Sequence, residues 1–168
     1  MATNKTSNGA QVVLRLLVVI SSAVSAYLMF TSKEETVIYD LPMSAKYSYS
    51  PAFKFEAYIN VAASVFGLIT LIVSSVGLRH GNPTTYFFLF LHDLVLMSLV
   101  LGGCSAAAAI GYVGKNGFEQ AGWTAICDHF NPFCKRASTS IMLGLGSTIF
   151  LFLLSILSAI NSRHIHNH

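Results

Sequence analysis

The stretch FLFLHDLVLMSLVLGG, from Phe88 to Gly103, decides the fold class of this chain. His92 and Asp93 are its only ionisable side chains. The stretch is apolar enough to lie inside a bilayer, whose core of about 30 Å is crossed by about 20 helical residues. A carboxylate in that environment is costly, so we expect Asp93 to have a partner inside the protein.

The composition of the whole chain is typical of a membrane protein. Of 168 residues, 54% are hydrophobic and 10% are charged, and the mean hydropathy is +0.61. Soluble domains carry about 25% charged residues. The formal charge of +3 includes no basic block, which argues against nucleic acid as a partner.

Four apolar segments are long enough to cross a bilayer as helices. None of them alternates polar and apolar residues, so a β-barrel is disfavoured. We therefore predict an all-α membrane protein, an antiparallel bundle of four transmembrane helices with two extracellular loops. The predicted helices span residues of about 11–31, 55–78, 85–113 and 138–160, between an N-terminal tail of residues 1–10 and a C-terminal tail of residues 161–168.

Four crossings place both termini on one side of the membrane and the two longer loops on the other. A raw count of Lys and Arg favours the side with the two longer loops as cytoplasmic. The count does not decide the orientation, because those loops are about twice as long and also carry almost every acid. Cys127 and Cys134 lie in the second long loop with six residues between them. A disulfide there would contribute about 2–3 kcal/mol, and it would need an oxidising compartment outside the cell. Two free thiols are the alternative.

Asp93 has one candidate partner among the basic residues, Arg15. With both termini on the cytoplasmic side, Arg15 lies about 6 Å and Asp93 about 12 Å into the same leaflet, at 1.5 Å per residue. We expect no other acid within the four spans. The prediction is an ion pair between the first and third helices. A proton relay that also uses His92, or a protonated Asp93, would be the alternatives.

Small residues allow membrane helices to approach each other closely. Such residues occur in every predicted helix, and they serve either packing within the bundle or contact between chains. The candidates for helix packing are Ala63, Gly67, Gly102, Gly103, Gly144 and Gly146.

Together these features resemble the CASP-like family, plant four-helix membrane proteins related to the Casparian strip membrane domain proteins and more distantly to MARVEL-type tetraspan proteins. The segment YSYSPAFKFEAYINV before the second helix is also similar to this family. The matching residues are Arg15, Asp93 and the second-loop pattern of Trp123, Cys127, Phe130, Phe133 and Cys134.

The resemblance implies cytoplasmic termini, a plasma-membrane location and self-association into homo-oligomers or hetero-oligomers with relatives. Casparian strip members are scaffolds that gather wall-modifying enzymes, and they carry a first-loop signature of the type ESLPFFTQF. The first loop here reads KEETVIYDLPMSAKYSYSP and lacks that signature.

We therefore predict a non-enzymatic plasma-membrane scaffold that presents its extracellular loops to partners. Its expected partners are membrane lipid, copies of itself, relatives and extracellular or cell-wall proteins. No nucleophile motif, phosphate-binding loop or CxxC pair is present in the sequence, and we predict neither a cofactor nor a metal. The alternatives are a small proton- or ion-coupled transporter or channel that uses Asp93, and an accessory subunit of a larger membrane complex.

Overall fold

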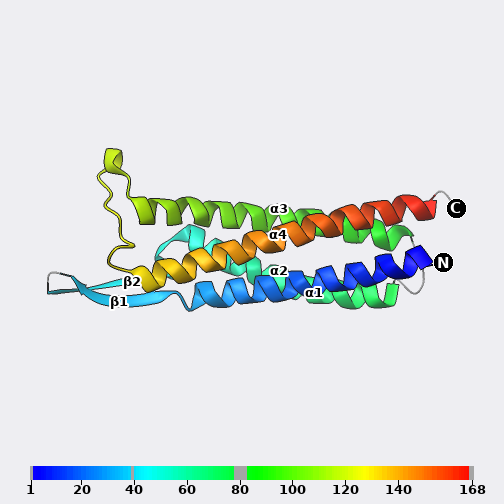
Figure 1. Ribbon diagram of the computed structural model, residues 1–168, viewed down its shortest axis with the longest axis horizontal. Helices are drawn as coiled ribbons and strands as arrows, with labels where there is room; N and C mark the ends of the chain where they lie inside the picture. Colours follow the sequence, from blue (N-terminus) through cyan, green and yellow to red (C-terminus); the bar gives the residue numbers. More distant parts are fainter. Residues whose placement is uncertain (1, 39, 78–82, 167–168) are drawn as a thin grey trace.

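Four long helices run side by side, and both chain termini lie at the same end of the bundle (Figure 1). The computed structural model describes residues 2–38, 40–77 and 83–166. Each helix contains a stretch that is long and apolar enough to cross a membrane. The predicted four-helix bundle is therefore confirmed. The helices are α1 (Ala2–Phe30), α2 (Pro51–Gly77), α3 (Pro83–Asn116) and α4 (Asn131–His166).

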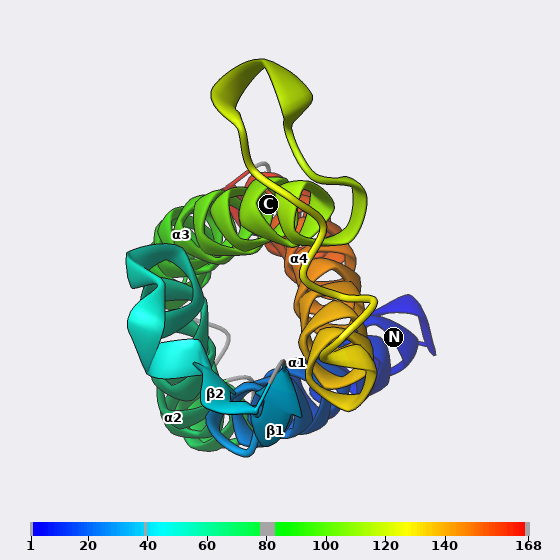
Figure 2. The same ribbon diagram turned by 90° about the vertical axis from the view of Figure 1, so that its left-hand side faces the viewer.

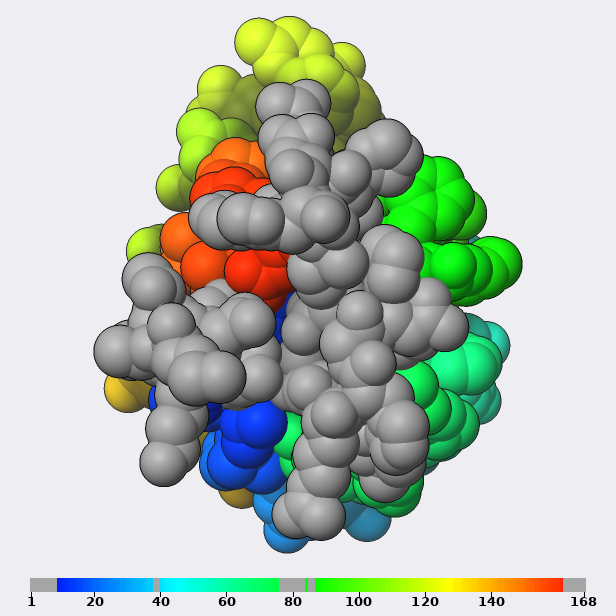
Figure 3. Space-filling model, turned by 90° about the vertical axis from the view of Figure 1, so that its right-hand side faces the viewer, coloured from blue at the N-terminus to red at the C-terminus, as the bar shows by residue number. Residues whose placement is uncertain are grey.

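Seen from one end, the helices form a ring in chain order (Figure 2). Each helix packs chiefly against its neighbours in the sequence, and α4 closes the ring against α1. Helices α1 and α3 therefore lie diagonally across the bundle. We call the end of the bundle with the termini the terminal end, and the opposite end the loop end. Figure 3 views the terminal end, where parts of α3 and α4 are visible.

Helix α4 begins at Asn131, seven residues before the predicted residue 138. The Asn131-Pro132 pair favours a turn in isolation, but proline is also well suited to the first turn of a helix, where no N–H donor is needed. Cys134 consequently lies in the helix and not in the loop. The predicted N-terminal tail is likewise helical from Ala2 onward.

The first loop contains a β-hairpin that the sequence analysis did not predict. Strand β1 (Lys33–Ile38) pairs antiparallel with β2 (Leu41–Lys46), and Lys33 lies opposite Lys46. The β-branched residues near the end of β1 favour an extended strand. Between the strands, Asp40 has a φ of 62°, a conformation that aspartate tolerates better than most residues. The hairpin extends beyond the helices at the loop end (Figure 1).

The bundle has polar groups inside and large apolar side chains outside. Ile72 is 65% exposed and Met142 is 73% exposed, whereas Glu56 and Asp93 are buried. This distribution suits a lipid environment, because hydrocarbon contacts the apolar surface while polar groups find partners between helices. The apolar core includes Val18, Met29, Ala63, Leu96, Val100, Leu151 and Leu154.

Candidate functional site

The two intramembrane charges singled out in the sequence lie together in the interior. Arg15 Nη1 donates to Asp93 Oδ1 at 3.1 Å, and Nη2 donates to Oδ2 at 2.8 Å. The side chains are 2% and 1% exposed. Two parallel hydrogen bonds match the planar guanidinium to the carboxylate and hold both groups in one orientation.

Thr70 of α2 completes this charge cluster, which consists of Arg15, Thr70 and Asp93. Arg15 Nη1 also donates to Thr70 Oγ1 at 2.9 Å, and Thr70 Oγ1 donates to the Gly67 carbonyl at 3.0 Å. Because α1 and α3 are diagonal in the ring, the long arginine side chain has to cross the bundle interior. The cluster thereby connects three helices.

His92 lies beside the charge cluster at the surface of α3. Its Nδ1 is 3.4 Å from Asp93 Oδ1, and its side chain is 31% exposed. The imidazole ring also contacts Phe66 of α2, with 5.9 Å between ring centroids. His92 is thus the one neighbour that connects Asp93 with the outer surface among the contacts described for this cluster.

A second buried acid, Glu56, corrects the sequence analysis. The expectation that Asp93 is the only acid within the spans was wrong, because Glu56 lies inside the apolar stretch Pro51–Ser75 of α2 and is 0% exposed. Glu56 lies near the start of α2, a position where acidic side chains are usually exposed to water. The signal that could have identified it is Asn60, one helical turn further on and on the same face.

Glu56 has hydroxyl and amide partners. Its Oε1 lies 2.9 Å from Ser25 Oγ, 3.2 Å from Ser140 Oγ and 3.0 Å from Asn60 Nδ2. None of these neighbours is a cation. Glu56 Oε2 and Asn60 Oδ1 are buried without a hydrogen-bond partner among the described residues. We call Ser25, Glu56, Asn60 and Ser140 the carboxyl cluster.

The two serines of the carboxyl cluster also join α1 to α4 directly. Ser25 Oγ is 2.8 Å from the Ser140 carbonyl oxygen, and Ser140 Oγ is 2.7 Å from the Ser25 carbonyl oxygen. Each hydroxyl therefore lies between a backbone acceptor on the facing helix and the carboxyl group. With Glu56 and Asn60 on α2, this cluster also connects three helices.

Gly144 allows α4 to approach the carboxyl cluster. A Cβ atom at this position would lie 2.5 Å from Cys104 Sγ and 3.3 Å from both Asn60 Nδ2 and Ser25 Oγ. Real Cβ atoms do not come that close to sulfur, so any larger residue would have to displace a helix or a buried side chain.

The other predicted packing residues divide into two groups. Ala63 is fully buried, and a Cβ on Gly67 or Gly103 would lie 2.9 Å from a side chain of a neighbouring helix. In contrast, a Cβ on Gly102 or Gly146 would meet nothing within 4 Å. Gly102 and Gly146 therefore do not serve packing within one bundle.

The two clusters are separated along the bundle. Arg15 and Ser25 lie ten residues apart on α1, about 15 Å at 1.5 Å per residue. Buried Val18, Ala63 and Val100 occupy the positions between them. Ser22 and Ser147 are also buried there, but each hydroxyl donates to a carbonyl of its own helix. The described interior thus fastens helices at two levels and has an apolar layer between them.

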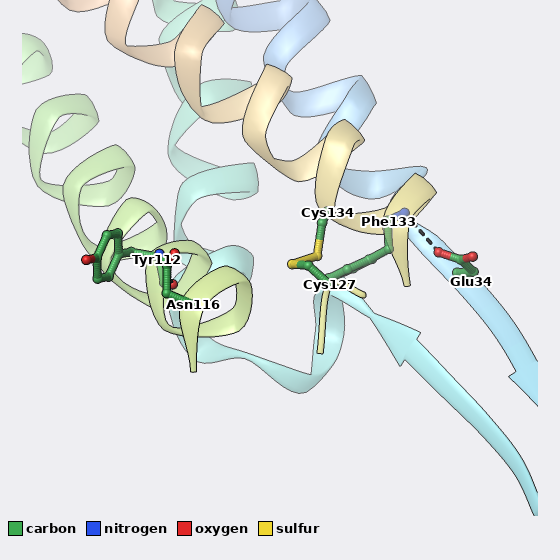
Figure 4. The surroundings of a disulfide bond; sticks show 6 residues. All are labelled: Glu34, Tyr112, Asn116, Cys127, Phe133 and Cys134. Carbon is green, nitrogen blue, oxygen red and sulfur yellow. Dashed lines mark hydrogen bonds between the residues drawn. A yellow bond between two sulfur atoms is a disulfide. The ribbon is translucent and has the colours of Figure 1, made fainter. Parts of the chain in front are cut away.

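A third set of contacts holds the loops at the loop end. A disulfide joins Cys127 of the second loop to Cys134 in α4, with 5.7 Å between the Cα atoms (Figure 4). Glu34 of β1 accepts a hydrogen bond from the Phe133 backbone N–H at 3.0 Å. The first N–H groups of a helix have no partner within the helix, and a carboxylate is favourable there. Glu34, which the sequence analysis did not select, thus caps α4.

The aromatic residues of the second-loop pattern have different surroundings. Phe130 and Phe133 are buried, and the Phe133 ring centroid is 6.1 Å from that of Phe53. Trp123 is 61% exposed and Phe118 is 49% exposed. The loop between α3 and α4 that contains them projects from the ring (Figure 2). The phenylalanines of the pattern anchor the loop, and Trp123 is available for contact.

Comparison with known proteins gives a consistent result over nearly the whole chain. The Casparian strip membrane protein domain matches residues 4–150. CASP-like protein 1F2 of Populus trichocarpa is 50% identical, and the match covers 96% of this chain and 91% of the relative. CASP-like protein 1F1 of Vitis vinifera is 46% identical, with 98% and 81% covered. No solved structure matches the chain.

Proposed function

The chain belongs to the Casparian strip membrane protein family, and from this premise we propose that it is a non-enzymatic scaffold of the plasma membrane. In this proposal it associates laterally with copies of itself or with relatives, and it presents its loops to partner proteins. The observation that carries the proposal is a row of small residues on the outer surface of α3. This small face consists of Ser98, Gly102, Ser105, Ala106 and Ala109, all of them exposed.

The small face would allow a helix of another chain to approach α3 closely, because the bundle itself does not use this surface for packing. It extends over twelve residues of α3, about 16 Å along the axis, and a Cβ built on Gly102 has nothing within 4 Å. Membrane helices associate through such surfaces because their backbones can come near each other. Gly146 on α4 is equally open, but large exposed side chains flank it at Met142 and Ile149.

The interior supports a structural role. The charge cluster and the carboxyl cluster each bind helices together, and buried apolar residues separate them. A bundle whose helices are fastened to each other at two levels is suited to holding a fixed lateral surface. No catalytic step is assigned to it.

The disulfide supports an orientation with the loop end outside the cell. Such bonds persist in oxidising compartments and are rare in the cytosol. In this orientation both termini are cytoplasmic, and the hairpin and the exposed Trp123 face the extracellular space. These loops are the surfaces that we propose for extracellular or cell-wall partners.

The test is the mass of the purified protein in nanodiscs, measured by light scattering corrected for lipid. We expect a discrete multiple of the 18.2 kDa chain mass. Gly102→Leu should reduce it toward the monomer, because a large side chain blocks close approach. Gly146→Leu is the matched control and should leave the multiple unchanged. A wild-type monomer would contradict self-association, and equal effects of both variants would contradict the assignment to α3.

A proton or ion pathway through Asp93 is the second candidate function, and the 3.4 Å contact with His92 favours it. Flux into liposomes loaded with a pH-sensitive dye distinguishes the two functions. The scaffold should be silent in this assay. A flux that His92→Gln abolishes, while the folded yield is preserved, would establish transport instead.

A further inference from the structure

A cavity of about 570 Å³ lies at the loop end, outside both polar clusters. Residues 110–115 of α3 and 131–141 of α4 contribute most of its wall, and Phe53 of α2 adds to it. The disulfide between Cys127 and Cys134 also lines it, in the region that Figure 4 shows. Its volume is within the range of about 300–1,000 Å³ that small-molecule sites occupy.

The wall of this cavity combines an apolar surface with positive charge. Phe53, Phe133 and Ile141 are buried, and Ile110 is partly exposed on the outer side. The ionisable groups that line the cavity are Lys115 and Lys135, and no acid is among the lining residues. A ligand that fits this wall needs an apolar body and an anionic end.

The position of the cavity in the bundle narrows the choice of ligand. Its wall follows α4 for eleven residues from the first residue of an apolar span, about 15 Å along the axis. The cavity therefore lies where two apolar spans, Phe87–Asn116 and Asn131–Asn161, end on the loop-end side of the bundle. Ile110 and Ile126, which are 40% and 45% exposed, make its outer side apolar as well. An apolar outer side suits entry from a lipid phase.

We propose that this cavity binds an anionic membrane lipid of the leaflet at the loop end. An acyl chain occupies the apolar wall between α3 and α4, and the headgroup lies against Lys115 and Lys135. Lysines at a membrane boundary often extend toward water without any ligand, but that behaviour requires neither a cavity beside them nor a lining free of acids. The proposal does not depend on self-association of the chain.

Native mass spectrometry of the protein released from nanodiscs tests this proposal. The nanodiscs contain equal amounts of phosphatidylglycerol and phosphatidylcholine, which share acyl chains and differ in headgroup charge. We expect the phosphatidylglycerol-bound form to exceed the phosphatidylcholine-bound form about 25-fold, because two lysines contribute about 1 kcal/mol each and 1.4 kcal/mol is tenfold.

Substitutions inside and outside the cavity test where the lipid binds. Lys115→Gln with Lys135→Gln should bring the ratio of the two bound forms close to one. Lys33→Gln with Lys54→Gln removes the same charge from exposed lysines outside the cavity and should leave the ratio unchanged. Gly111→Phe should lower the total lipid-bound fraction, because a Cβ there meets only Ile141 at 3.8 Å and the ring extends into the cavity.

Three results would overturn the proposal. The first is a wild-type ratio near one, which requires no variant at all. The second is an equal loss of preference with the control lysine pair, which would indicate a general surface field. The third is a protein dimer that the Lys115 and Lys135 substitutions dissociate with no bound lipid, because the occupant would then be a second copy of the chain.

Discussion

Both buried clusters contain a carboxyl group in the interior of the bundle, but they stabilise it in different ways. In the charge cluster, the carboxylate of Asp93 receives two hydrogen bonds from the guanidinium of Arg15. In the carboxyl cluster, Glu56 is equally buried, but it lies among two serines and an asparagine and one of its oxygens has no partner. One cluster is an ion pair across the bundle, and the other is a polar contact between neighbouring helices.

This difference indicates which substitutions each cluster can tolerate. An ion pair fails when one member is neutralised, because the remaining charge is then buried alone. A carboxyl group surrounded by hydrogen-bond donors needs an acceptor oxygen in the right place more than it needs a charge. The comparison therefore predicts opposite responses to substitution of a carboxyl by an amide at the two sites.

The largest effect is expected from Asp93→Asn. It leaves the buried Arg15 without a counter-charge and should lower the free energy of unfolding by about 3–5 kcal/mol. Titration with a denaturing detergent in mixed micelles measures this quantity. The double variant Arg15→Met with Asp93→Leu should recover much of the loss, because apolar residues can replace a buried pair. An Asp93→Asn protein as stable as the wild type would show that the pair does not hold the bundle.

The next effect is expected at Glu56 and should depend on the replacement. Glu56→Ala removes the oxygen that faces the Asn60 amide and the hydroxyls of Ser25 and Ser140, and it should lower the free energy of unfolding by about 2–3 kcal/mol. Glu56→Gln is the matched control, and it should change that free energy by less than about 1 kcal/mol because it keeps an oxygen. If Glu56→Gln is as harmful as Glu56→Ala in the same titration, the two clusters are alike and the comparison fails.

Sequence alone predicted the pairing of Arg15 with Asp93 for an energetic reason, but not the contact with Thr70. Arg15 and Asp93 are single charges within long apolar segments, and the cost of burying either one alone points to the other as its partner. The four helices follow from the same reasoning, because hydrophobic length is directly visible in a sequence. These features do not depend on the details of packing.

The carboxyl cluster could not be predicted in the same way. Ser25 and Ser140 lie 31 and 84 residues from Glu56 in the sequence. Serine is common in membrane helices, so its selection as a partner depends on the ring order and on the rotation of each helix. Glu34 illustrates the same limit, because its role at the start of α4 requires a hairpin that hydropathy does not reveal.

Alanine substitutions at Gly144 and Gly146 test whether close helix packing stabilises the carboxyl cluster. Gly144→Ala should lower the free energy of unfolding by about 1–3 kcal/mol, because its methyl group collides with Cys104 beside the carboxyl cluster. Gly146→Ala meets nothing within 4 Å, and alanine favours the helix by up to about 1 kcal/mol. The two alanine variants should thus differ in sign in the same unfolding titration. Equal effects would mean that α4 does not depend on close approach at the carboxyl cluster.

Removal of single hydroxyl groups should have smaller effects than Asp93→Asn or Glu56→Ala, and the size of each effect reports the charge of the partner. Thr70→Val removes an acceptor of the Arg15 guanidinium, and hydrogen bonds to charged groups contribute about 1.5 kcal/mol or more. Ser25→Ala removes a contact to the carboxyl of Glu56, and hydrogen bonds between membrane helices average about 0.6 kcal/mol. Thr70→Val should therefore be the more harmful of the two substitutions in paired unfolding titrations. The reverse order would place the stronger electrostatic interaction at Glu56, and the charge cluster would then be the weaker fastening of the bundle.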